Sequence, residues 1–99
     1  MYARLTTFHL AMNKHDKAVE LYENSVIPEA KKQNGFRGAY FLANRNAGKF
    51  VSITLWDSME NAVENQKSGY YQRQIDKFDE FSVDAPDIEG FSVKAMAEK

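Results

Sequence analysis

The segment FVSITLWDSMENA, residues 50 to 62, contains the only tryptophan of the sequence. Trp56 ends a run of alternating side chains typical of a β-strand, and a helix start follows it. Phe50, Ser52 and Thr54 would share its face of that strand. The indole ring could pack against a flat aromatic molecule and donate its N–H to a substrate oxygen. The alternative is that Trp56 fills the core of a small domain.

A second group of candidates lies in a helix predicted over residues 69–81. Its periodicity places Tyr71 on the stripe of Ile75 and Phe78, so the tyrosine hydroxyl should face the sheet and need a partner there. Arg73 could direct positive charge at a phenolate or carboxylate, or it could be a solvated surface residue.

Other chemical signatures are weak or missing. The 99 residues include no cysteine, and the two histidines, His9 and His15, are most simply structural or surface residues. No carboxylate pair, Ser/His/Asp group or glycine-rich nucleotide loop is indicated by spacing. We therefore predict no metal site and no cofactor.

The periodicities predict one domain covering residues 1–99. The element order is β-α-β-β-α-β, which is typical of a ferredoxin-like α+β fold with a four-stranded antiparallel sheet and its helices on one face. The strands are expected at about 2–11, 36–44, 49–56 and 91–96. The helical segments are expected at 14–33, with a kink or break at Pro28, and at 58–66 and 69–81.

Local signals mark several of these boundaries. Asn13 could cap the first helix, Gly35 could close it in a left-handed conformation, and Asp57 or Ser58 could cap the next. In the first strand, Arg4, Thr6 and Phe8 would face one side of the sheet, with Tyr2 and Leu10. The other side would carry Ala3, Leu5, Thr7 and His9.

Helices on one face leave the other face of the sheet in need of cover, and both faces look apolar. Val51, Ile53 and Leu55 form a wholly aliphatic row on one side of their strand. Because such a row is costly to leave in water, we expect a homodimer that pairs through the open sheet face and the C-terminal strand.

The charge pattern limits the classes of partner. Fourteen acidic and 13 basic residues are scattered along the chain and give a formal net charge of −1. This does not resemble the basic stripe of a nucleic-acid-binding protein. No apolar run is long enough for a membrane span or a secretory signal, so we expect a cytoplasmic protein with neither nucleic acid nor membrane as partner.

The stretch NGFRGAYFLANRNAGKFVSITLWDSMENA, together with VDAPDIEGFSVKAM, resembles the antibiotic biosynthesis monooxygenase family. The order and spacing of these segments carry the resemblance, which covers essentially the whole chain. It implies a ferredoxin-like subunit that pairs into a dimeric α+β barrel. The oxygenase members have an asparagine where this chain has Ser52. The functional side chains of the haem-degrading members align with Thr6, Asn65 and Ile75 of this chain. None of the three matches, so the resemblance does not favour haem degradation.

The leading functional hypothesis is a cofactor-independent monooxygenase acting on a phenolic or quinol-like aromatic molecule. One alternative is a non-catalytic module that binds a small hydrophobic ligand, and another is an isomerase or lyase acting on a small carbonyl compound. Trp56 and Arg73 are the predicted catalytic residues. The predicted substrate-binding residues are Thr6, Phe8, Ser52, Thr54, Tyr71 and Phe78.

Overall fold

Four strands form one antiparallel sheet in the order β2-β3-β1-β4. The structure is a computed structural model that describes all of residues 1–99. The strands are β1 (Tyr2–His9), β2 (Phe36–Asn44), β3 (Lys49–Trp56) and β4 (Asp87–Ser92). Both strands of the predicted hairpin have the expected bounds, and a 3-10 turn at Arg45–Ala47 connects them.

The helices occupy two stretches of the chain, one after β1 and one after β3. The first stretch begins with a 3-10 turn at Met12–Lys14 and the second ends with one at Asp79–Phe81. The first stretch then contains α1 (His15–Leu21), a π-helical turn (Tyr22–Val26) and α2 (Ile27–Ala30). The second stretch contains α3 (Met59–Lys67) and α4 (Tyr70–Asp76).

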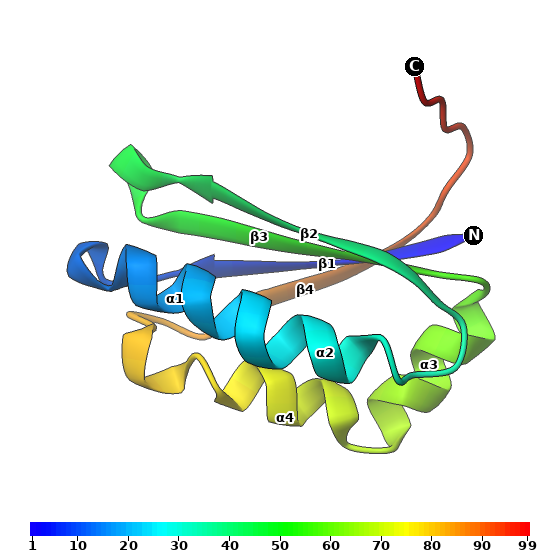
Figure 1. Cartoon of the computed structure of the whole chain (residues 1–99), viewed down its shortest axis with the longest axis horizontal. Coiled ribbons are helices and arrows are strands. Elements are labelled where there is room, and N and C mark those ends of the chain that lie inside the picture. The colour runs from blue at the N-terminus through cyan, green and yellow to red at the C-terminus, as the bar shows by residue number, and fades with distance from the viewer.

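All the helices pack against one face of the sheet, as Figure 1 shows. The other face carries no helix, and the chain after β4 leaves the sheet on that side. This arrangement confirms the predicted ferredoxin-like α+β fold with helices on one face. None of the helices has the length and apolar character that a membrane crossing requires.

The register between β1 and β3 places the residues of the inner sheet face. Arg4 lies opposite Thr54, Thr6 opposite Ser52, and Phe8 opposite Phe50. The helices contribute the other side of the core through two stripes at helical spacing. These stripes contain Ala18, Tyr22, Val26 and Ala30 from the first stretch, and Tyr71, Ile75 and Phe78 from the second.

The last strand differs from its prediction. It begins at Asp87, so DIEG belongs to β4, while the predicted strand over residues 91–96 ends at Ser92. Asp, Glu and Gly are disfavoured in strands, and here pairing with β1 overrides that preference. Gly90 also has a packing role, because a side chain there would collide with the phenol ring of Tyr2.

The predicted start of the first helix was also wrong. Asn13 makes no cap, because a 3-10 turn comes first and α1 begins only at His15. At Pro28 the chain does not break. The π-helical turn precedes α2, and the amide of Ile27 donates to the carbonyl of Tyr22. Proline cannot donate the next helical hydrogen bond, and the wider turn keeps the helix continuous at that point.

Of two other boundary predictions, the cap of α3 is confirmed, but Gly35 does not close the first helix, because α2 ends at Ala30 with Lys31 at its C-cap. Gly35 adopts a left-handed conformation with φ 80°, and its carbonyl accepts a 2.7 Å hydrogen bond from the amide of Asp57. Ser58, rather than Asp57, caps α3 by accepting from the amide of Asn61. These contacts join the end of the first helical stretch to the start of α3.

Gly35 allows a test of this junction. A Cβ at this position would lie 2.7 Å from Cβ of Asn61 and closer still to its amide group. Gly69 also has a positive φ, but a Cβ there would meet only the flexible tip of Arg73, at 3.3 Å. We expect Gly69→Ala to lower the free energy of unfolding by about 1–2 kcal/mol. Gly35→Ala should cost measurably more in urea denaturation, and equal losses would contradict this packing.

Candidate functional site

A cavity lies between the inner sheet face and the helices. Seven of the eight residues predicted for a site line it: Thr6, Phe8, Ser52, Thr54, Trp56, Tyr71 and Phe78. They come from β1, from β3 and from the second helical stretch, where Tyr71 lies in α4 and Phe78 just after it. The eighth, Arg73, is on the exposed side of α4 and does not line the cavity. The catalytic or binding role of each residue remains a prediction.

The cavity is small, because ring side chains fill most of the space between the layers. Its free volume is about 30 Å³, which is room for one or two water molecules. Pockets for drug-sized ligands have volumes of about 300–1,000 Å³. Phe78 packs against Phe8 with ring centroids 4.9 Å apart, and both are almost fully buried. A ligand with even one aromatic ring must therefore displace side chains to enter.

Hydroxyl groups line the cavity in pairs. The hydroxyls of Thr6 and Tyr71 are hydrogen-bonded to each other, which provides the partner that the sequence required for Tyr71. The hydroxyl of Tyr22 is 2.8 Å from that of Ser52. Each pair joins a helical residue to a strand residue across the cavity, and either oxygen of a pair could redirect its proton to a ligand.

Trp56 is both a core residue and a wall of the cavity. Only 1% of its surface is exposed, and the ring of Phe36 meets it edge-on at a centroid distance of 5.7 Å. Its N–H donates to the hydroxyl of Thr54 at 3.0 Å. The indole N–H is therefore already satisfied, and a substrate oxygen would have to compete with Thr54 for it.

Arg4 is the functional candidate that the site prediction missed. Its side chain enters the cavity from β1, and only 4% of the residue is exposed. The guanidinium carbon lies 4.0 Å from the ring centroid of Tyr71 and 5.5 Å from that of Trp56. Alternation along β1 had placed Arg4 on this face, but nothing in the sequence marked its side chain as buried.

Burial also determines the protonation of the cavity tyrosines. It raises the pKa of Tyr71 and of Tyr22, against the opposing effect of their hydroxyl partners. Burial, with smaller effects from Glu29 and Tyr22, raises the pKa of Tyr70 to about 12. These tyrosines are neutral at pH 7 and can act as hydrogen-bond donors there.

Neither histidine lies in the cavity wall. Nδ1 of His9 is 3.1 Å from a carboxylate oxygen of Asp84 at the surface, and the His15 ring packs 5.1 Å from that of Phe50. No three His, Asp or Glu side chains converge in a way that could hold a metal ion.

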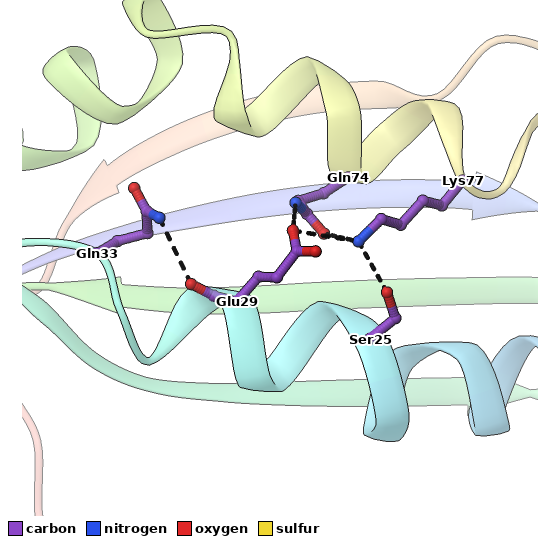
Figure 2. A network of polar contacts seen from close by, with 5 residues as sticks. All are labelled: Ser25, Glu29, Gln33, Gln74 and Lys77. Carbon is purple, nitrogen blue, oxygen red and sulfur yellow. Dashed lines mark hydrogen bonds and ion pairs between the residues drawn. The ribbon is translucent and has the colours of Figure 1, made fainter.

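A polar network joins the two helices that cover the cavity (Figure 2). The amide of Gln74 donates to Glu29 at 2.6 Å, and the Lys77 ammonium donates to Gln74 and Ser25. Lys77 also lies 3.2 Å from the carboxylate of Glu29. We call Ser25, Glu29, Gln74 and Lys77 the seam network. Since Gln74 also lines the cavity, the seam network connects the cavity wall to the protein surface.

Comparison with known proteins begins with sequence. No model of a known protein family matches the chain. Two uncharacterized proteins from strains of Mycobacterium tuberculosis are 30% identical to it over 63 residues, which is 64% of this chain. The chain matches only 28% of the length of those relatives.

Solved structures match along nearly the whole chain. The monooxygenase ActVA-Orf6 of Streptomyces coelicolor, in complex with nanaomycin D, superimposes with a TM-score of 0.82 at 16% identity, covering 99% of this chain and 91% of that one. The cofactor-independent oxygenase SnoaB of Streptomyces nogalater gives 0.74 at 12% identity, covering 99% and 97%. A protein described as an antibiotic biosynthesis monooxygenase gives 0.74 at 10% identity, covering 96% and 100%.

The chain has the fold of the antibiotic biosynthesis monooxygenases. The resemblance drawn from the sequence is thus confirmed for the fold. At these identities the monooxygenase fold is what the comparison establishes, because one fold can support several chemistries.

The seam network predicts a pH dependence of stability. The hydrogen bond from Gln74, and then that from Lys77, lowers the pKa of Glu29 below its usual 4.5. The network should contribute fully to stability at pH values above 4.5, and this contribution should be lost as the pH falls through the lower pKa that Glu29 has in the folded protein. Glu29→Gln should lower the midpoint of thermal unfolding by a few degrees near neutral pH, since a partly exposed pair contributes about 0.2–1 kcal/mol.

The control for this experiment is Glu23→Gln, a carboxylate in the same helical stretch that makes no ion pair. Thermal unfolding of both variants and the native protein would be followed from about pH 3 to pH 7. The difference between native protein and Glu29→Gln should shrink on acidification. A difference that stays constant over this pH range would contradict a role for the protonation of Glu29.

Proposed function

We propose that the protein is a cofactor-independent monooxygenase that oxidises a phenolic or quinol-like ring in the cavity. The observation that carries the proposal is the composition of the cavity wall. Aromatic side chains make up most of the apolar wall of a space with room for one or two water molecules, and paired hydroxyls from facing layers line it. The shared fold adds support, because SnoaB is described as a cofactor-independent oxygenase.

The proposed reaction needs no external electrons. A phenol and O₂ give a quinone and water: one oxygen atom forms a bond to the ring, and the other leaves as water when the O–O bond breaks. The ring loses the hydroxyl proton and the hydrogen on the attacked carbon, and it supplies all four electrons. The protein's tasks are therefore to orient the ring, exclude water and stabilise the oxyanions.

Neutral Tyr71 is suited to the last task. Its hydroxyl can turn from Thr6 towards a phenolate or hydroperoxide oxygen, and its raised pKa keeps the donated proton in place. The residues lining the cavity include no carboxylate and no histidine. The substrate would therefore lose its proton to water or to oxygen-derived anions, and acidic phenols should react fastest.

The size of the cavity limits the substrate. A benzene-sized ligand occupies a cavity of about 150 Å³, and only about 30 Å³ is free here. We propose that entry separates α2 from α4, because the sheet side is held by two strand ladders. Small rings should enter more readily than polycyclic ones.

Oxygen uptake tests the function. Native protein would be mixed with hydroquinone, catechol or 1,4-dihydroxynaphthalene, with the uncatalysed rate subtracted and no metal or flavin added. We expect saturable uptake of one O₂ per substrate. Tyr71→Phe should lower kcat roughly a hundredfold, as the loss of an oxyanion donor does elsewhere. Trp56→Phe should weaken substrate binding.

Tyr40→Phe is the matched control, since this tyrosine is 60% exposed on the outer sheet face. It should leave the rate unchanged. Uptake no faster than without protein, or uptake insensitive to Tyr71→Phe, would contradict the oxygenase. Saturable quenching of Trp56 fluorescence without uptake would instead favour the ligand-binding module. Turnover without oxygen would favour the isomerase or lyase.

We also propose that two copies pair through the open sheet face. Strand register aligns apolar side chains across it: Leu5 with Ile53 and Tyr40, and Val51 with Leu42. Leu42 is 48% exposed in the single chain, and Phe91 in β4 is 46% exposed. A second copy would cover this apolar surface and complete a barrel from two sheets.

Scattering measures the assembly directly. We expect native protein at micromolar concentration to give twice the 11.4 kDa of one chain, and Leu42→Asp to shift it towards the single chain. Val83→Asp is the control, because Val83 is 67% exposed but lies outside the four strands. A native protein that remains a single chain would overturn the dimer.

A further inference from the structure

The charge on Arg4 is not neutralised within the chain. The three ion pairs join His9 to Asp84, Arg37 to Asp57 and Lys77 to Glu29, and none involves Arg4. Charged groups buried in proteins are normally paired with an opposite charge. A guanidinium keeps its proton in proteins, so this cavity contains a permanent positive charge with no anion beside it.

Two neutral acceptors fix the direction of the guanidinium. Nη1 donates to the side-chain oxygen of Asn65 at 3.1 Å, and Nη2 donates to the carbonyl of Ala62 at 2.5 Å. Asn65 is itself held by its own donation to Gln33 at 3.2 Å. These contacts orient Arg4 from α3 without cancelling its charge.

Three of the five N–H groups of Arg4 have no acceptor in the chain, and the one on Nε is among them. Tyr71 and Trp56 flank the guanidinium carbon, but no hydrogen bond joins either of them to Arg4, so they leave the donors along its edges unpaired. The free donors lie in the guanidinium plane, and a planar anion with two oxygens can accept from such an edge.

We propose that Arg4 binds the carboxylate of an aromatic acid whose ring occupies the cavity. A carboxylate is ionised throughout the neutral pH range, whereas an ordinary phenol is not. Its two oxygens also match the geometry of guanidinium donors, which a single phenolate oxygen does not. Arg4 is then a specificity-determining residue. This inference rests on the proposed function only in placing the ligand in the same cavity.

Binding of matched probes tests the inference. The probes are 4-hydroxybenzoate, its neutral amide 4-hydroxybenzamide, and 4-nitrophenol at a pH where it is ionised. Binding would be followed by fluorescence of Trp56, which lies 5.5 Å from the guanidinium of Arg4, and by calorimetry. Native protein should bind the acid roughly ten- to a hundredfold more tightly than the amide, as charge-assisted hydrogen bonds predict.

Arg4→Met should reduce that preference to about twofold or less, while Arg45→Met, which removes an exposed arginine from the hairpin turn, should preserve it. Circular dichroism would establish that both variants are folded. If Arg4→Met does not fold, Arg4→Lys takes its place, because lysine keeps the positive charge but loses the forked donors, and it should also reduce the preference for the acid. Equal affinities for acid and amide would overturn the inference, and so would binding of the phenolate as tight as that of the acid.

The outcomes separate this inference from the proposed function. Oxygen uptake with neutral quinols, without a preference for the acid, would retain the oxygenase and overturn the role of Arg4. Selective binding of the acid, without oxygen uptake by any substrate, would retain the role of Arg4 and overturn the oxygenase. A preference for the acid that persists in Arg4→Met would show that Arg4 is structural only.

Discussion

The register of β1 against β3 is the constraint on which the cavity depends. It sets Arg4, Thr6 and Phe8 in one row under the helices, beside Ser52 and Thr54 of β3. Because side chains alternate along a strand, a slip of one residue would turn that row to the outer face. Such a slip would expose Phe8 and bury the residues that now face outward. This cost strongly favours the observed register. The packing that stabilises the domain therefore also places the candidate site.

The helical side of the cavity depends on a less regular feature. Tyr22 and Val26 begin and end the π-helical turn, and both reach the cavity. Pro28 follows two residues later and lacks the amide that an unbroken α-helix would use. The wider turn accommodates the proline and keeps these two residues on the inner face. Such turns are frequent at functional sites, because they shift side chains relative to a regular helix.

Much of this arrangement could be predicted from the sequence, because alternation and helical spacing are local signals. The hairpin strands and the inward faces of β1 and β3 followed from them, as did the stripe of Tyr71 and Phe78. The start of β4 did not, because Asp87 and Gly90 become strand residues only by pairing with β1. The burial of Arg4 with no carboxylate beside it depends on three elements meeting, and no sequence spacing encodes that.

The two sides of the cavity differ in how firmly they are held. The sheet side consists of β1 between β3 and β4, so its backbone is hydrogen-bonded along both edges. Across the helical seam, Glu29 and Lys77 form a partly exposed pair, and such pairs contribute little to stability. Local opening follows the weakest contacts in a structure. A ligand larger than the free volume should therefore enter between α2 and α4, which would bring its ring to Gln74 and Tyr71 before it reached the strands.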